Sequence, residues 1–135
     1  MMTSIYMLQL DITDSTVSKN FSDPENNDGV TVYIDAANVN HTQGLIRASL
    51  VFFLSADNKV IVKEGKSGNW VTKSANAVKH AAISGPPGYV QELAIPWNLL
   101  GGKPRVNTRI GYNMSLTENT GKSSPELYRN HFFKP

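Results

Sequence analysis

The alternation of apolar and polar positions is clearest toward the carboxyl end of the chain. Residues 89–95 have the period of a pleated strand, with one face that carries Tyr89, Gln91, Leu93 and Ile95. Proline cannot donate a hydrogen bond to a strand ladder but fits the first turn of a helix. Residues 96–100 therefore predict one helical turn, ended by Gly101 and Gly102, and a second strand is expected from Arg109.

Two segments nearer the amino end also predict strands. Residues 5–12 are apolar on nearly both faces, which is typical of a strand in the middle of a sheet. Residues 30–35 alternate, with Val30, Val32 and Ile34 on one face and Thr31, Tyr33 and Asp35 on the other. This second pattern indicates a strand that is buried on one side only.

The middle of the chain contains one strong strand signal and one ambiguous segment. The apolar run 45–54 predicts a buried strand, paired through a turn at Asp57 and Asn58 to residues 60–62. Residues 71–83 fit either a strand or a helix with an apolar stripe. Loops rich in Gly, Pro, Ser, Asn and Asp are expected at residues 19–29, 36–44, 65–69, 85–88 and 119–126.

Short strands separated by turns, with one brief helical corner at 96–100, indicate an all-β fold. We expect an antiparallel β-sandwich of immunoglobulin-like or jelly-roll-like architecture. A chain of 135 residues, 40% of them hydrophobic, has the size of one domain, and we take residues 1–135 as that domain.

The composition excludes several classes of function. The chain has no cysteine, which removes disulfides, thiolate zinc sites and cysteine nucleophiles. Its 13 basic and 11 acidic residues are scattered and give a net charge of +2, so nucleic acid is not an expected partner. No apolar run approaches the roughly 20 residues of a membrane helix, so no membrane partner is expected.

Three blocks of the sequence resemble the family 9 carbohydrate-binding modules. "ELAIPWNLLG" followed by "IGYNMSLTEN" is similar to the last strand pair of that family. "DGVTVYIDAANVN" (28–40) and "YMLQLDITDSTV" (6–17) are similar to two earlier strands that carry aspartates. The blocks stand in the expected order over most of the chain. The resemblance implies a non-catalytic sandwich that binds carbohydrate, and it favours a strand at 77–83.

The resemblance also implies where a sugar would bind. Two tryptophans clamp the sugar in the family, and the matching positions here fall near Glu25 and near Tyr128. The positions that hold an acid, an arginine and a glutamine in the family correspond to Thr31, roughly Phe52, and Ser115.

Aromatic side chains outside the core are further candidates, because a pyranose can lie flat on an aromatic ring. Trp70 lies beside a Gly/Ser/Asn turn and Tyr33 lies on the polar face of its strand, whereas Trp97 in the helical corner is expected to pack in the core. The predicted carbohydrate-binding residues are Tyr128, Trp70, Tyr33, Glu25, Thr31 and Ser115.

A metal site and two other classes of function are weaker alternatives. Asp23, Glu25 and Asp28 offer hard oxygen ligands within one loop, which predicts a Ca²⁺ site, although loops are rich in such residues in any case. Asp35 and Glu92 are a conceivable glycosidase pair, but the chain has no HExxH or G-x-S-x-G motif, and no catalytic residue is predicted. A haem site at Met114 is less favoured than packing in the core.

The sequence thus predicts a non-catalytic module of a polysaccharide-degrading protein of the glycoside hydrolase or xylanase type. Weak binding of plant-type glycans or their chain ends is expected, with a Kd of about 10 µM to 1 mM. The alternative is a degenerate structural or interaction module of a larger enzyme, with no glycan binding of its own.

The location and assembly follow from the amino end. Residues 1–10 contain no Lys or Arg and do not resemble a signal peptide. The family has further strands before the block that matches residues 5–13, which predicts a piece of a longer extracellular or periplasmic protein. Without those strands, an exposed sheet edge predicts a homodimer.

Overall fold

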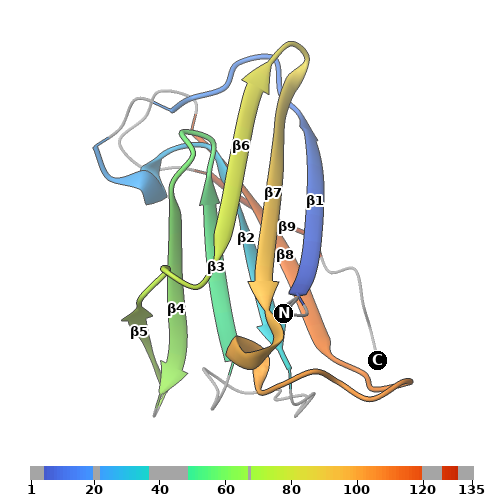
Figure 1. The fold of residues 1–135 in the computed structure, drawn as a ribbon. Coiled ribbons are helices and arrows are strands. Elements are labelled where there is room, and N and C mark those ends of the chain that lie inside the picture. Colours follow the sequence, from blue (N-terminus) through green and yellow to red (C-terminus); the bar gives the residue numbers. More distant parts are fainter. Residues whose placement is uncertain (1–4, 20–21, 37–48, 67, 120–125, 131–135) are drawn as a thin grey trace.

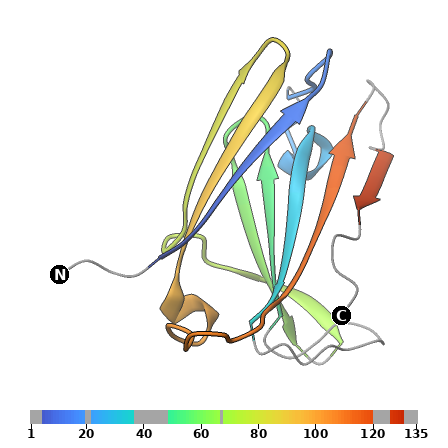
Figure 2. The ribbon, with the colours of Figure 1, turned by 90° about the vertical axis from the view of Figure 1, so that its right-hand side faces the viewer.

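The computed structural model describes residues 5–19, 22–36, 49–66, 68–119 and 126–130, the last segment by its backbone alone. Within these ranges the chain forms two antiparallel sheets that face each other (Figures 1 and 2). The strand order is β1–β7–β6 in the three-stranded sheet and β5–β4–β3–β2–β8–β9 in the six-stranded sheet. The predicted antiparallel β-sandwich is confirmed.

Consecutive strands along the chain are distributed between the two sheets. The three-stranded sheet consists of β1 (Ile5–Thr13), β6 (Lys79–Gly85) and β7 (Gly88–Pro96). The six-stranded sheet consists of β2 (Gly29–Asp35), β3 (Ser49–Ser55), β4 (Val60–Lys66), β5 (Asn69–Lys73), β8 (Gly111–Glu118) and β9 (Glu126–Asn130). Two 3₁₀ turns complete the described elements, η1 (Pro24–Asn26) and η2 (Trp97–Leu100).

The core lies between the two sheets and is built by the alternation of side chains along each strand. The inward positions of β2, β3 and β7 are all buried: Val30, Val32, Ile34, Leu50, Phe52, Leu54, Tyr89, Gln91, Leu93 and Ile95. The predicted faces of residues 30–35 and 89–95 are therefore confirmed. Because every second residue is used for the core, the remaining residues of the same strands face outward.

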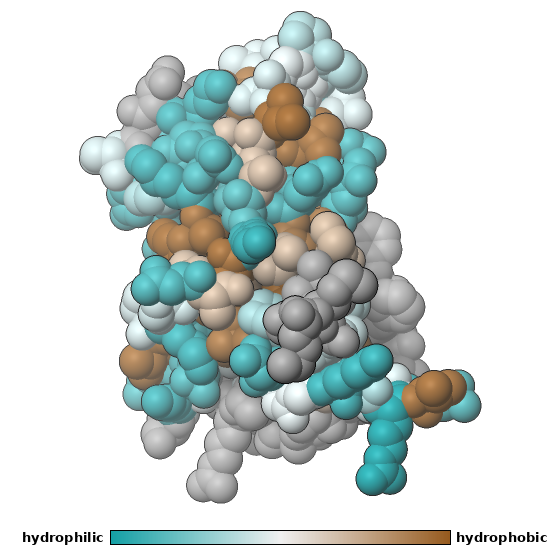
Figure 3. Space-filling model, in the orientation of Figure 1, coloured by the Kyte–Doolittle hydropathy of each residue, from teal (hydrophilic) through white to brown (hydrophobic). Residues whose placement is uncertain are grey.

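The prediction that residues 5–12 form a central strand is wrong, because β1 lies at an edge of its sheet and, among the described strands, pairs with β7 alone. Leu8 and Leu10 pack against the core, but Met7 is on the outer face and its side chain is 63% exposed. The apolar character of Met7 made both faces look buried. Figure 3 shows the face of this sheet, where hydrophobic and hydrophilic residues are mixed.

The helical corner after β7 forms as predicted. Pro96 caps η2, and Gly101 ends it in the left-handed region with φ of 92°, which glycine adopts without strain. Trp97 is partly exposed and packs on Tyr6 with ring centroids 5.4 Å apart, so it covers the end of the core rather than filling it. The following strand begins at Gly111 rather than at Arg109.

The ambiguous middle segment consists of strands. Residues 69–73 form β5 and residues 79–85 form β6, so the preferred strand interpretation is confirmed from Lys79 onward and the helical alternative is wrong. The apolar run 45–54 forms β3 from Ser49, paired to β4 as predicted. Residues 37–48, which include most of the expected turn at 36–44, lie outside the described ranges.

Two polar contacts between described residues connect the sheets. Gln91 on β7 is fully buried, donates through Nε2 to the Leu54 carbonyl on β3 at 3.2 Å, and accepts through Oε1 from His80 Nε2. Asn58 in the β3–β4 turn accepts from the Ala82 amide of β6 at 2.9 Å. Burial lowers the pKa of His80, because a charged imidazole would be desolvated there.

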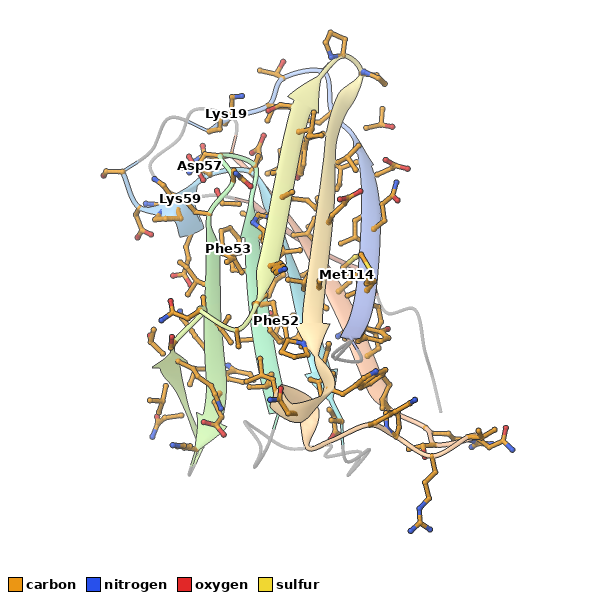
Figure 4. The ribbon with its side chains drawn as sticks, viewed as in Figure 1. Lys19, Phe52, Phe53, Asp57, Lys59 and Met114 are labelled. Carbon is orange, nitrogen blue, oxygen red and sulfur yellow. The ribbon has the colours of Figure 1, made fainter. Side chains whose placement is uncertain are left out.

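The β3–β4 turn carries an ion pair of its own. Lys59 Nζ lies 3.0 Å from Asp57 Oδ2, and both residues belong to this turn (Figure 4). Burial alone would raise the pKa of Asp57, but hydrogen bonds from Ser55 and Lys59 hold it below its ordinary value.

No helix within the described ranges has the length and apolar character of a membrane span.

Candidate functional site

A groove of about 330 Å³ lies on the outer face of the six-stranded sheet. The side chains that alternate with the core residues of β2, β3 and β4 point to this face. The described residues that line the groove are Glu25, Thr31, Tyr33, Val51, Phe53, Ile61, Lys63, Trp70 and Thr117. They come from η1 and five strands, so the groove exists only in the folded chain.

Two aromatic rings form one side of the groove. Tyr33 on β2 and Trp70 on β5 approach each other across the intervening strands, with ring centroids 6.5 Å apart and planes inclined at 51°. The Cα partner of Trp70 on β4 is Gly65, which has no side chain on this face and leaves room for the indole. Both rings are only partly buried, so they offer apolar surface to a ligand.

The floor of the groove is apolar. Phe52 and Phe53 are neighbours on β3 (Figure 4), but Phe52 is fully buried between the sheets, whereas Phe53 lines the groove and keeps 6% exposure. Its register partner Ile61 lies beside it, and Val51 is the next residue along the same face. A Cβ at Gly29 would lie 2.9 Å from Phe53 Cζ, so this glycine provides space for the Phe53 ring.

The polar side of the groove is set by η1. Asp23 caps this turn by accepting from the Glu25 amide at 3.1 Å, and Pro24 favours the start of the turn. The turn directs Glu25 toward β4, where Oε1 lies 2.6 Å from the Lys63 ammonium. The lining of the groove thus contains an ion pair as well as the two aromatic rings.

A buried carboxylate fixes the loop that carries η1. Asp28 is 1% exposed and accepts from the Ser18 amide at 2.7 Å and from the Asn119 amide at 2.6 Å. Asn119 in turn donates through Nδ2 to the Asn26 carbonyl at 2.7 Å. Burial, together with the nearby carboxyl of Asp14, raises the pKa of Asp28 to about 6. The position of Glu25 therefore depends on a network that joins this loop to the end of β8.

The proposed calcium ligands lie in different surroundings. Asp23 caps η1, Glu25 pairs with Lys63, and both oxygens of Asp28 accept backbone amides. Within the described ranges, no group of three or more His, Cys, Asp or Glu side chains is placed to hold a metal ion. The calcium site stays a prediction from the sequence.

The groove brings together four of the six predicted carbohydrate-binding residues, namely Glu25, Thr31, Tyr33 and Trp70. Ser115 is the Cα partner of Thr31 on β8 and is buried next to the groove rather than in its lining. Tyr128 lies on β9 and is the Cα partner of Leu116 on β8. The structure describes β9 by its backbone alone. Phe52, the position that roughly corresponds to the family's arginine, is fully buried between the sheets, whereas its neighbour Phe53 lines the groove.

Sequence reasoning missed five lining residues, which are Val51, Phe53, Ile61, Lys63 and Thr117. Val51 and Phe53 belong to β3, which is apolar on both faces and for which the sequence predicts a buried strand. Ile61 lies on the strand paired to it, opposite Phe53. The missed signal is that β3 is apolar on a face that no second layer covers among the described residues. Lys63 gave no signal, because its partner Glu25 lies far away in the sequence.

The residues considered for a glycosidase pair and for a haem site lie outside the groove. Asp35 is on the outward-facing side of β2, and Glu92 is exposed on the outer face of β7, so the sandwich separates the conceivable glycosidase pair. Met114 is partly buried against the core, with its sulfur 3.8 Å from the Tyr112 hydroxyl (Figure 4). A larger groove of about 620 Å³ beside the β6–β7 hairpin has no aromatic ring among its described lining residues.

Comparison with known proteins places these features in context. The profile of the family described as "Carbohydrate family 9 binding domain-like" matches residues 2–130. No curated protein matches the chain significantly.

Two solved structures of a carbohydrate binding module family 9 from Caldicellulosiruptor kristjanssonii are similar to this chain. The complex with cellotriose superposes with a TM-score of 0.69 at 17% identity, over 92% of this chain and 57% of that chain. The complex with glucose gives 0.66 and 16%, over 93% of this chain and 59% of that one. At these identities the likeness shows the fold, and the chain spans less than two thirds of either solved chain.

Proposed function

Because this chain belongs to the carbohydrate family 9 binding domain-like family, we propose that it binds a neutral plant-type glycan in the groove on the outer face of the six-stranded sheet. The module has no catalytic role of its own in this proposal. It holds a larger polysaccharide-degrading protein, of the glycoside hydrolase or xylanase type, near its substrate.

The observation that carries the proposal is the contact of Tyr33 and Trp70 in a groove that also contains an apolar floor and the Glu25–Lys63 pair. The C–H-rich face of a pyranose can pack on such rings, while its hydroxyls need hydrogen-bonding groups at the edge. Here Glu25 accepts, Lys63 donates, and Thr31 and Thr117 can do both. The groove therefore contains both kinds of contact that a sugar ring requires.

The groove is shallow and has few polar groups, so weak binding is expected. A Kd of about 10 µM to 1 mM corresponds to roughly 4–7 kcal/mol of binding free energy, which a few stacking and hydrogen-bonding contacts can supply. The solved relatives of the same fold carry cellotriose and glucose, which makes gluco-oligosaccharides the first ligands to test. An extracellular or periplasmic location fits a module of this kind.

The second candidate is a degenerate module that contacts other parts of a larger enzyme. It is favoured by the loss of charged groups at the positions that the resemblance matches, since Thr31 and, roughly, Phe52 stand where the family has an acid and an arginine. Calorimetric titration with cello-, xylo- and manno-oligosaccharides separates the two. Saturable heat at micromolar to millimolar ligand supports glycan binding. Silence for all three series at millimolar concentration leaves only the degenerate module.

A further inference from the structure

The Glu25–Lys63 pair is the charged part of the groove. The Lys63 ammonium lies 2.6 Å from Glu25 Oε1, and the side chains keep 30% and 41% exposure, respectively. The other lining residues within the described ranges are uncharged. The groove therefore contains one acid and one base in direct contact, and their charges sum to zero.

The placement of the pair has a consequence for hydrogen bonding. Lys63 is on β4 next to the strand that provides the floor, and Glu25 is on η1, so the pair spans the groove from the sheet to the loop. An ammonium has three N–H donors and a carboxylate has two acceptor oxygens, so the pair does not use all of its hydrogen-bonding capacity internally. One free acceptor and free donors remain within reach of two neighbouring hydroxyls of a sugar.

The same pair disfavours acidic ligands. A uronic acid would bring a carboxylate into this groove, where the apolar walls displace part of its hydration and the neutral pair supplies no net positive charge in return. Lys63 cannot offset this cost, because Glu25 already neutralises its charge. A neutral diol meets no such penalty.

We propose that the Glu25–Lys63 pair is the specificity determinant of the groove, and that it selects uncharged sugars with adjacent hydroxyls over their uronic-acid counterparts. This inference rests on the proposed function, because it concerns the same groove. It assigns to Glu25 and Lys63 a role in ligand choice.

The experiment compares two ligands of the same size and linkage, cellotriose and its C6-oxidised trisaccharide, by calorimetry at low and at physiological salt. The wild-type protein should bind cellotriose at least about tenfold more tightly. In Glu25→Gln, Lys63 loses its neutralising partner, so cellotriose affinity should fall about three- to tenfold while the preference for the neutral ligand disappears or reverses. Lys63→Met should lose cellotriose affinity and still reject the acidic ligand.

Glu64→Gln is the matched control. It changes the net charge as Glu25→Gln does, but Glu64 pairs with Lys66 and Lys73 and does not line the groove. Its affinities and ligand preference should equal those of the wild type. Thermal melting of each variant establishes that all of them are folded.

The outcomes separate the two proposals. If cellotriose binds but Glu25→Gln and Lys63→Met keep the wild-type affinity and preference, the pair is not a determinant, although the groove remains a glycan site. If Glu64→Gln shifts the preference as much as Glu25→Gln does, net charge alone explains it and the inference fails. If the folded wild type binds neither ligand, this inference and the proposed function fail together.

Discussion

The indole of Trp70 lies against the phenol of Tyr33, with ring centroids 6.5 Å apart, although the two residues belong to strands that are separated in the sheet by β3 and β4. The contact is formed above the sheet, where Gly65 leaves space next to Trp70. Sheet order and a missing side chain therefore produce an aromatic surface that no local stretch of sequence contains.

Removing the indole should weaken glycan binding more than it weakens the fold. Trp70 is on the edge strand β5 and is only partly buried, so Trp70→Ala should reduce cellotriose affinity about tenfold, equivalent to about 1.4 kcal/mol. Trp97→Phe is the control, because Trp97 packs on Tyr6 away from the groove. Calorimetric titration measures both, and equal affinities for Trp70→Ala and the wild type would contradict the assignment.

The neighbouring phenylalanines of β3 should have separate roles. Phe52 is fully buried between the sheets, so Phe52→Ala should cost about 3–5 kcal/mol of unfolding free energy. Phe53→Ala should cost less, about 1–3 kcal/mol, because its ring lines an open groove, and it should also lower ligand affinity. Urea unfolding combined with titration tests this pair. Equal costs together with unchanged affinity for Phe53→Ala would contradict the placement of the floor.

The close approach of β1 to β7 depends on a glycine. A Cβ at Gly88 would lie 1.9 Å from the Ile12 carbonyl oxygen, so Gly88→Ala must displace β1 and should cost about 2 kcal/mol or more. A Cβ at Gly85, the register partner of Gly88 on the other side of the same turn, would meet no neighbouring atom within 4 Å, and Gly85→Ala should stay within about 0.5 kcal/mol. Chemical denaturation measures the unfolding free energy of both variants. Similar values would show that β1 and β7 are not packed this closely.

The strand pattern could be predicted from the sequence where one face of a strand is polar. In β2, Thr31 and Tyr33 alternate with valines, and the alternation alone assigned them to the outer face. In β7 the same rule worked, although Gln91 is polar and buried, because the apolar residues around it fixed the face. The alternation of apolar and polar residues is sufficient to assign the two faces of a strand when one face is buried and the other faces outward.

The remainder of the site could not be predicted, for two physical reasons. A strand that is apolar on both faces carries no information about which face is covered, so Phe53 was assigned to the core region and Met7 to a central strand. Contacts such as Glu25–Lys63 depend on which strands are neighbours, and that order is a property of the whole sheet. Sequence reasoning therefore identified Glu25 but not its partner.

The buried Asp28 should make stability depend on pH. Its folded-state pKa of about 6 lies above the ordinary value of 3.8, so between these pH values the folded protein binds more protons than the unfolded chain. The contribution of Asp28 to stability is therefore complete below about pH 4 and is lost as the pH rises to about 6. Asp28→Asn cannot ionise and should lose this slope, whereas Asp23→Asn, at an exposed cap, should keep it.

Urea unfolding at pH 4, 5 and 6 measures these slopes. Only the slopes are compared, because Asp28→Asn also lowers the stability at every pH. Asp28 accepts two backbone N–H groups, and the NH₂ of an asparagine side chain cannot accept the second of them. A wild-type slope that Asp28→Asn leaves unchanged would show that another group titrates in this range.

The most direct test of glycan binding in the groove uses the two tryptophans as separate reporters. The indole N–H signals of Trp70 and Trp97 can be followed in an ¹H–¹⁵N spectrum during titration with cellotriose, and Trp97→Phe assigns them. We expect the Trp70 signal to shift in a saturable manner, with a Kd of about 10 µM to 1 mM, while the Trp97 signal stays in place. A Trp70 signal that does not move at millimolar cellotriose would contradict this expectation.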